Sequence, residues 1–392
     1  MRHWRTPKLT SEHALLSASS RERWCKDHCP PSAKEEAKYA DRPNKYAIEG
    51  TYYHEIAAQC LQNNCDAKDW ASLDIAYDVG DKHPEPTNEG LTAVQIYLDT
   101  VRKDLKDNPG ELGVERRVFI TPDHWGTCDA FIWCPDNGVL KVIDYKHGKG
   151  VYVGVENNKQ LQSYAVGVYN TLNNKDAVKT VELTIVQPRA GGSAVRRFSV
   201  DREEFLIWID EINADVEAAL DPYAEFNAGK WCKYCKAAPN CDALKALALK
   251  SAQEDFSDIQ QVSIHPDELQ GEQLADALRQ AQISEIWIKA VRSQAYDVAM
   301  QGGAVPGFKL VQKRPVRKWK NEKRTVTILK NRGIEEPFVI PKIKSPAAVE
   351  KEAGDKEITK GLVISESSGV TLVSDSDGRP AVASSAVADF VD

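Results

Sequence analysis

The sequence predicts an α/β fold with a central mixed β-sheet flanked by helices. Residues 91–107 place apolar side chains at helical spacing, and residues 127–133 and 139–145 are strand-like runs on either side of a strong turn signal. Helices come first, then three strands, then a helix and more strands, which is typical of α/β proteins. A chain of 392 residues is long enough for two domains.

Composition narrows the class of protein. Hydrophobic residues make up 42% of the chain and charged residues 28%, which excludes collagen-like and fully disordered chains. No apolar run approaches a membrane span, and residues 1–5 do not resemble a secretory signal. We therefore expect no membrane association and a cytoplasmic location. Nine cysteines in a reducing compartment make a disulfide framework unexpected.

The N-terminal half begins with helices. Ser19 and Glu22 have the spacing of a capping box, and the helix they open ends before Cys29 and Pro30. A second helix is expected to begin near Gly50 and to carry His54. The helix over 91–107 follows it.

The remaining elements divide the chain into four segments. Further strands are expected at 114–120, 181–187 and 195–200, and helices at 157–171, 201–220, 242–250 and 264–300. We expect a core domain over 1–245, a helical segment over 246–303, a basic segment over 304–345 and a largely disordered acidic tail over 346–392.

A hairpin collects the charged residues of the core. Residues 135–138 read Pro-Asp-Asn-Gly, which indicates a tight turn between two strands. Side chains alternate along a strand, so a loop of two or four residues puts Asp129, Asp144 and Lys146 on one face. A loop of three residues turns Asp129 away from the other two.

This triplet suits phosphodiester hydrolysis. Two carboxylates hold a hard cation such as Mg²⁺ or Mn²⁺, and a lysine orients water or stabilises developing negative charge. The alternative is an ordinary surface ion pair. The apolar neighbours Phe131, Val142 and Ile143 argue against a solvated face.

Several motifs in order resemble the RecB-like branch of the PD-(D/E)XK nuclease superfamily. They are Gly50 to Glu55 with its histidine, Gly126 to Asp129, Asp144-Tyr145-Lys146, Gln160-x3-Tyr164, a serine-rich start followed by Cys29-Pro30, and a late cysteine cluster. Over residues 10–245 the chain is similar to the iron–sulfur nucleases of the AddB and CRISPR-associated groups. It resembles most a phage-borne family with a similar C-terminal extension.

The resemblance implies a restriction-endonuclease-like core and a role for each matching residue. The implied metal ligands are His54, Asp129, Asp144 and the carbonyl of Tyr145. The other implied active-site residues are Lys146 as the catalytic lysine, Gln160 and Tyr164, which touch DNA or orient the lysine, and Glu115, an acidic position before the hairpin.

The cysteines Cys232, Cys235 and Cys241 have the spacing of ligands to a metal or cluster. Three thiolates leave one position open, which the resemblance assigns to Cys29, with Cys25 as the rival. A [4Fe–4S] cluster is expected first and Zn²⁺ second, since five residues between ligands depart from common zinc spacings. Unliganded thiols are the remaining alternative.

The basic segment mixes cations with an aromatic ring. The candidate DNA-contacting residues are Lys313, Arg314, Arg317, Lys318, Trp319 and Lys320. Their cations would follow the phosphates while Trp319 stacks on a base. The alternative is a solvated strand pair or a surface loop.

Taken together, these features predict a Mg²⁺- or Mn²⁺-dependent deoxyribonuclease. We expect an exonuclease that acts on linear DNA ends in phage-type recombination or DNA processing, in the bacterial host cell if a phage encodes it. DNA is the expected partner, with a single-strand annealing protein as a second. The alternative is a catalytically inactive DNA-binding or scaffold protein with a structural metal cluster.

Overall fold

The computed structural model describes residues 14–40, 45–73, 86–257, 271–334, 338–339, 342–355, 357–366, 370–374 and 381–382. The chain forms two compact units, residues 1–287 and 288–392. In none of the described stretches does a helix combine the length and the apolar character that crossing a membrane requires.

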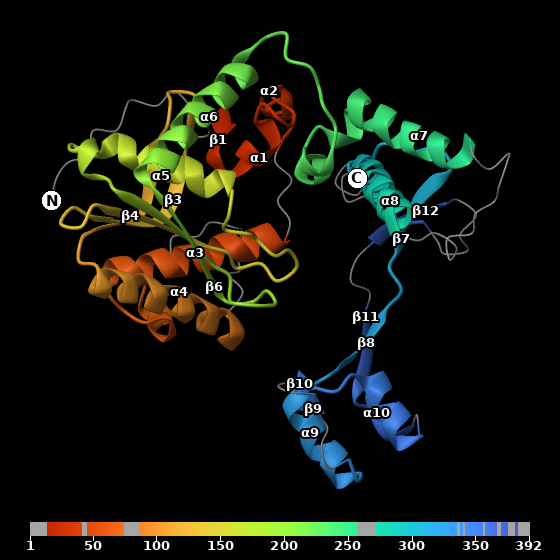
Figure 1. Cartoon of the computed structure of the whole chain (residues 1–392). Helices are drawn as coiled ribbons and strands as arrows, with labels where there is room; N and C mark the ends of the chain where they lie inside the picture. Colours follow the sequence, from red (N-terminus) through yellow and green to blue (C-terminus); the bar gives the residue numbers. More distant parts are fainter. Residues whose placement is uncertain are drawn as a thin grey trace, which may run out of the picture. The chain divides into compact units, whose positions relative to one another are not determined.

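A six-stranded mixed sheet forms the centre of the first unit (Figure 1). Its strands are β1 (Leu16–Ser17), β2 (Glu111–Phe119), β3 (His124–Cys134), β4 (Val139–Tyr145), β5 (Thr180–Val186) and β6 (Val195–Asp201). They lie in the order β1-β3-β4-β5-β6, and β2 also pairs with β3. The β1–β3 and β4–β5 pairs are parallel and the others antiparallel, so the predicted mixed sheet is confirmed.

Helices cover both faces of this sheet (Figure 1). One face packs on α3 (Lys45–Asn63) and α4 (Asn88–Asp107), and the other on α5 (Lys159–Thr171) and α6 (Arg202–Leu220). Strands buried on both faces need apolar side chains at consecutive positions, which explains the continuous apolar runs of β3 and β4.

The register of the hairpin positions its charged residues. Cys134 pairs with Val139, so the loop has four residues, and the ladder continues to Ala130 opposite Ile143. The next residue along, Asp129, therefore comes opposite Asp144. Instead of extending the ladder, the Asp129 carboxylate accepts the backbone N–H of Tyr145 at 2.8 Å.

The N-terminal segment differs in detail from the sequence prediction. Helix α1 (Arg21–Trp24) has Ser20 at its N-cap, without a side-chain capping bond, so the capping box expected at Ser19 is wrong. The hydroxyl of Ser20 lies 2.7 Å from that of Ser17 and so bonds within the preceding turn instead. The segment continues into α2 (Ser32–Glu36). By contrast, α6 has a side-chain cap, because Asp201 accepts the backbone N–H of Glu204.

Toward the end of the first unit come α7 (Asp242–Ser257) and α8 (Gly271–Met300). The described part of α8 begins at Gly271, so the start expected at residue 264 lies outside the described residues. Helix α8 passes the boundary at residue 287 and continues into the second unit.

Beyond α8, the described residues of the second unit form three antiparallel strand pairs and two α-helices, and one of the pairs joins β9 and β10. Its main elements are β7 (Phe308–Gln312), β8 (Val316–Trp319), α9 (Glu322–Asn331), β9 (Phe338–Val339), β10 (Lys342–Ile343), α10 (Pro346–Ala353), β11 (Val363–Glu366) and β12 (Val370–Ser374). β12 pairs with β7, and β11 with β8. The disordered tail expected from residue 346 is therefore wrong for the described residues up to 374, because β-branched runs there pair with the basic strands.

A buried ion pair fastens the N-terminal segment to the rest of the first unit. Arg21 and Asp215 are both fully buried, and Nε of Arg21 donates to Oδ2 of Asp215 at 2.8 Å. Arg21 also donates to the side chain of Gln162 on α5 at 3.1 Å. These contacts join α1, α5 and α6.

We predict that Asp215→Asn destabilises the protein by about 3–5 kcal/mol, because it leaves the buried Arg21 guanidinium without a counter-charge. Urea denaturation followed by tryptophan fluorescence measures the effect. Asp176→Asn is the matched control, since Asp176 pairs with Arg202 at the surface and its loss should leave the midpoint unchanged. Equal midpoints for the wild type and Asp215→Asn would contradict a stabilising role for the buried pair.

Candidate metal centre

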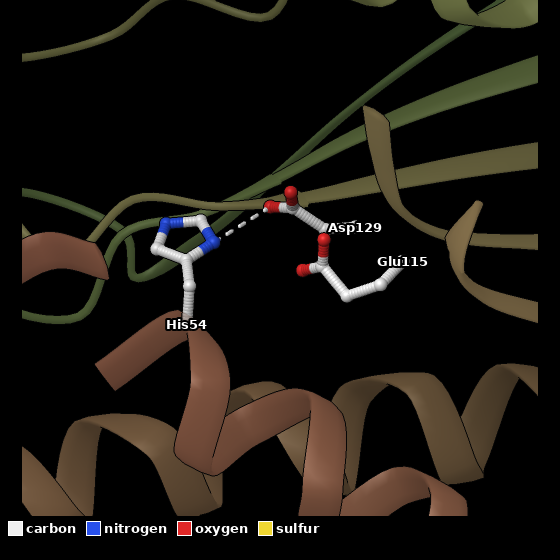
Figure 2. A group of neighbouring side chains, drawn as sticks. All are labelled: His54, Glu115 and Asp129. Atoms are coloured by element: carbon white, nitrogen blue, oxygen red, sulfur yellow. Dashed lines mark ion pairs between the residues drawn. The ribbon is translucent and has the colours of Figure 1, made fainter. Parts of the chain in front are cut away.

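Three side chains from different elements converge at one position (Figure 2). His54 comes from α3, Glu115 from β2 and Asp129 from β3. One possible ligand atom from each lies within 4.8 Å of the others. Nδ1 of His54 is 3.4 Å from Oδ2 of Asp129.

The backbone at Glu115 is strained. Its φ is +48°, a left-handed conformation that residues with a side chain rarely adopt. In the β2–β3 ladder Val114 pairs with Ala130 and Arg116 pairs with Cys128. Glu115 and Asp129 lie between these two pairs and are not paired with each other in the ladder. Such strain concentrates at functional sites, and here it coincides with the point where the two carboxylates meet.

A chain of hydrogen bonds extends from Lys146 to α5. Nζ of Lys146 is 2.9 Å from Oδ2 of Asp144 and donates to Oε1 of Gln160, also at 2.9 Å. Nε2 of Gln160 donates to the hydroxyl of Tyr164 at 3.0 Å. The structure thus brings together the lysine, the carboxylate and the helical pair that the sequence singled out.

Burial governs the protonation of the carboxylates. Burial, together with the negative charge of Asp129, raises the pKa of Glu115 to about 8. Burial also raises the pKa of Asp144 to about 6, although Lys146 acts in the opposite direction. Burial alone would raise the pKa of Asp129, but His54 and Lys146 hold it below its usual value. At neutral pH Glu115 therefore favours its protonated form, whereas the pKa of Asp129 is held low.

Neighbouring carboxylates raise the pKa of both basic groups against the effect of burial. Burial alone would lower the pKa of His54, but the Asp129 carboxylate raises it above the usual value. Burial would likewise lower the pKa of Lys146, and Asp144 and Asp129 raise it instead. Lys146 is consequently an ammonium at neutral pH.

The donor set fits a divalent cation. An imidazole and carboxylates suit Mn²⁺, and carboxylates with water suit Mg²⁺. A bound cation would offset the further negative charge that appears when Glu115 loses its proton. Compared with the expected ligand set, Glu115 joins His54 and Asp129 directly, while Asp144 is held by Lys146. Tyr145 takes part through its N–H, and a role for its carbonyl stays a prediction.

The sequence did not indicate a second layer of residues behind this site. Nη1 of Arg189 donates to Glu49 at 2.8 Å and contacts Nε2 of His147. His147 stacks on Tyr53 with ring centroids 3.9 Å apart, and its Nδ1 lies 2.8 Å from the hydroxyl of Tyr145. Burial and the charge of Arg189 lower the pKa of His147 to about 4, so this imidazole is neutral.

Two signals could have revealed this layer. His147 directly follows Lys146 in the sequence. Arg189 lies just beyond the end of β5, and Val186 on β5 pairs with Tyr145 in parallel. Neighbouring parallel strands end at the same edge of a sheet, so residues after β5 lie near those after β4.

The four cysteines of the expected cluster lie near one another. Burial raises the pKa of Cys29, and the thiol of Cys241 adds to this effect. Burial raises the pKa of Cys232 too, with contributions from Cys29 and Cys241. For Cys235, burial is again the main cause and its pKa reaches about 12, with Cys232 contributing. Such mutual effects need short distances between the thiols.

The rival ligand Cys25 belongs to a different environment. Its thiol donates to the carbonyl of Glu22 at 3.7 Å. Burial raises its pKa to about 11, and the charged side chains acting on it are Lys159, Asp215 and Glu22. No described cysteine is among these groups, so the structure favours Cys29 as the fourth member.

Two residues of the basic segment make contacts within the second unit. The indole N–H of Trp319 donates to the carbonyl of Lys344 at 3.0 Å, and the half-buried ring packs against the core of that unit. Arg317 forms an ion pair with Glu350 and donates to Thr359 at 2.8 Å. The cationic candidates Lys313, Arg314, Arg317, Lys318 and Lys320 are exposed. DNA contact by these residues and stacking of Trp319 on a base stay predictions.

The fold and the site define an α/β protein with a candidate divalent-metal centre. The chain belongs to the family described as protein of unknown function (DUF2800), whose model matches residues 13–380. Among solved structures it is similar to the crystal structure of SSO0001, at 14% identity over 54% of this chain and 93% of that chain. The TM-score of 0.22 is too low for this likeness to bear on the fold or the site.

We predict that Mn²⁺ affinity rises as the pH increases from about 6 to 8. Glu115, with a pKa of about 8, must lose its proton to bind a cation, so affinity gains up to about tenfold per pH unit for each proton released. Isothermal titration calorimetry in buffers of different ionisation enthalpy counts these protons. Glu115→Gln should bind more weakly and release about one proton fewer. An affinity independent of pH in the wild type would rule out Glu115 as a ligand.

Proposed function

We propose that this protein is a Mg²⁺- or Mn²⁺-dependent nuclease that hydrolyses the phosphodiester bonds of linear DNA. One observation carries the proposal, namely that the Lys146 ammonium is held by Asp144 and Gln160 beside the group of His54, Glu115 and Asp129. The resemblance of the motifs to RecB-like nucleases supports DNA ends as the substrate.

Each charged residue has a distinct task in this reaction. His54, Glu115 and Asp129 would hold the cation, with Asp144 as the further ligand that the sequence predicts. When bound, the cation polarises a phosphoryl oxygen and makes water more acidic. Lys146 is an N–H donor, so it orients the attacking water or stabilises the negative charge that develops on the phosphoryl oxygens.

The bond changes follow from these positions. The oxygen of a water molecule attacks phosphorus and the water gives up a proton, while the bond from phosphorus to the leaving oxygen breaks. The leaving oxygen takes up a proton in turn, so this step consumes one water and releases no net proton. Gln160 keeps Lys146 in place, because its amide accepts from Nζ while its own N–H₂ group donates to Tyr164. Tyr164 is buried, so this support is rigid.

We also propose that Cys29, Cys232, Cys235 and Cys241 hold a structural [4Fe–4S] cluster. Their thiols act on one another electrostatically, which supports a shared site. The five residues between Cys235 and Cys241 depart from common zinc spacings and favour a cluster, in which each thiolate binds a different iron.

Lys146→Ala is expected to reduce cleavage of linear DNA by about 10²- to 10⁴-fold in the presence of Mn²⁺, because it removes the donor at the reacting phosphate. Release of nucleotides from end-labelled duplex and single-stranded DNA is the measurement. Lys179→Ala, at an exposed lysine of the same unit, is the matched control and should cleave normally. A wild type that binds DNA but does not cut it would instead favour an inactive DNA-binding or scaffold protein.

For the cysteine group, Cys29→Ala should lower the iron content of anaerobically purified protein and its visible absorbance, whereas Cys25→Ala should retain both. The reason is that the Cys29 thiol lies with the other three and the Cys25 thiol does not. Metal analysis by mass spectrometry gives iron and zinc per chain. Zinc without iron in the wild type, or iron lost only in Cys25→Ala, would refute the assignment.

A further inference from the structure

The segment that follows the catalytic strand is an irregular loop with an unusual tip. Residues 146–158 contain no helix or strand. Val153 and Val155 within this loop pack against the core of the first unit. The two residues before them, Val151 and Tyr152, are exposed, and Tyr152 is 59% accessible. An exposed apolar pair so close to the candidate catalytic lysine needs a physical explanation.

The loop is held firmly although it is irregular. The buried side chain of Gln187 donates to the carbonyls of Gly148 and Val151, at 3.1 and 2.7 Å, and accepts the N–H of Val153 at 3.1 Å. The guanidinium of Arg196 donates to the carbonyl of Val153 at 2.9 Å and to Gln187 at 2.8 Å. Because these bonds satisfy the backbone on both sides of Tyr152, the tip has a defined position.

The anchor places this tip beside the candidate active site. Gln187 follows Val186 at the end of β5, and the backbone N–H of Lys146 donates to the carbonyl of Val186 at 2.8 Å. The residue that holds the loop is thus a direct neighbour of the catalytic lysine across two parallel strands. Tyr152 lies six positions after Lys146 in the sequence, which limits the distance between their Cα atoms to about 20 Å.

The Tyr152 ring is oriented by a cation on one side. The guanidinium carbon of Arg196 lies 4.3 Å from the ring centroid, and Arg196 itself is buried. A ring supported by a cation on one face and open to solvent elsewhere is ready to receive a second flat group. Exposed aromatic rings of this kind stack on nucleobases in proteins that bind single strands.

We propose that Tyr152 is a base-stacking subsite, which receives one nucleobase of the DNA strand whose phosphate lies at Lys146. This inference rests on the proposed function, because the nucleic acid bound at Lys146 supplies the base. It gives the nuclease a contact that depends on the position of a base and not on its identity, since every base has a π-face. The subsite therefore positions the strand without selecting a sequence.

The test is a binding scan with abasic DNA. A series of oligonucleotides carries one abasic position each, stepped from the end, and their affinities for the full chain are measured by fluorescence anisotropy in EDTA, where no metal-dependent cleavage occurs. The wild type should lose about tenfold in affinity at one position of the scan, where the stacked base is missing. Tyr152→Phe should give the same profile, because stacking uses the ring and not the hydroxyl.

Tyr152→Ala should bind intact DNA about tenfold more weakly and show no further loss at that one position. Tyr223→Ala is the matched control, since Tyr223 is 88% exposed on the loop after α6 and its loss should leave the profile unchanged. If Tyr152 has only a structural role, Tyr152→Ala should bind every oligonucleotide of the scan more weakly by the same factor. That result would overturn the proposal, and so would identical profiles for the wild type and Tyr152→Ala.

Cleavage is assayed separately, so the two proposals can fail independently. A position-specific loss that depends on Tyr152, found in a protein that never cuts DNA, would uphold the subsite and refute the nuclease. Cleavage that depends on Lys146, with a scan insensitive to Tyr152, would uphold the nuclease and refute the subsite.

Discussion

Three carboxyl groups and two basic side chains share one partly buried site, and the balance of their charges is the constraint on which the arrangement depends. Carboxylates this close repel one another strongly in a poorly solvated environment unless cations accompany them. Helix α3 positions His54 beside Asp129, and the end of β4 positions Lys146 beside Asp144. The raised pKa of Glu115 shows that this compensation is incomplete, because burial and the neighbouring carboxylate still favour its neutral form. A divalent cation is the natural complement of such a site.

The sheet holds these charges in register because both of its faces are packed. Strand β4 lies between β3 and β5, with helices above and below, so its end cannot shift without breaking two ladders. Beyond that end, Arg189 links Glu49 on α3 to His147, which follows Lys146. This second layer couples the position of α3, and hence of His54, to the end of β4. Its ion pairs therefore contribute to the geometry of the site more than to overall stability.

Local features of the sequence predicted the hairpin well, because turn type and alternation decide register over a few residues. The mixed sheet and the helices that cover it followed from the order of the elements. The meeting of Glu115 with His54 could not be derived in this way, since it depends on how α3 packs against β2. The same limit explains Trp319 and Arg317, whose partners Lys344 and Glu350 come from segments distant in sequence. Composition alone had assigned Glu350 to a disordered tail.

Strand β3 links the candidate metal centre to the N-terminal segment. Its first residues pair with β1, and the buried His124 lies 2.6 Å from the carbonyl of Leu16 through Nδ1, while Asp129 lies five residues further along the same strand. Burial lowers the pKa of His124 to about 4, so this contact carries no charge that could disturb the carboxylates. The N-terminal segment is also joined to α6 by the ion pair of Arg21 and Asp215. A cluster bound by Cys29 and the three cysteines beyond α6 would be a second link between the same two parts of the unit. Through β1, the ion pair and the cluster would then both restrain the start of β3, the strand that bears Asp129.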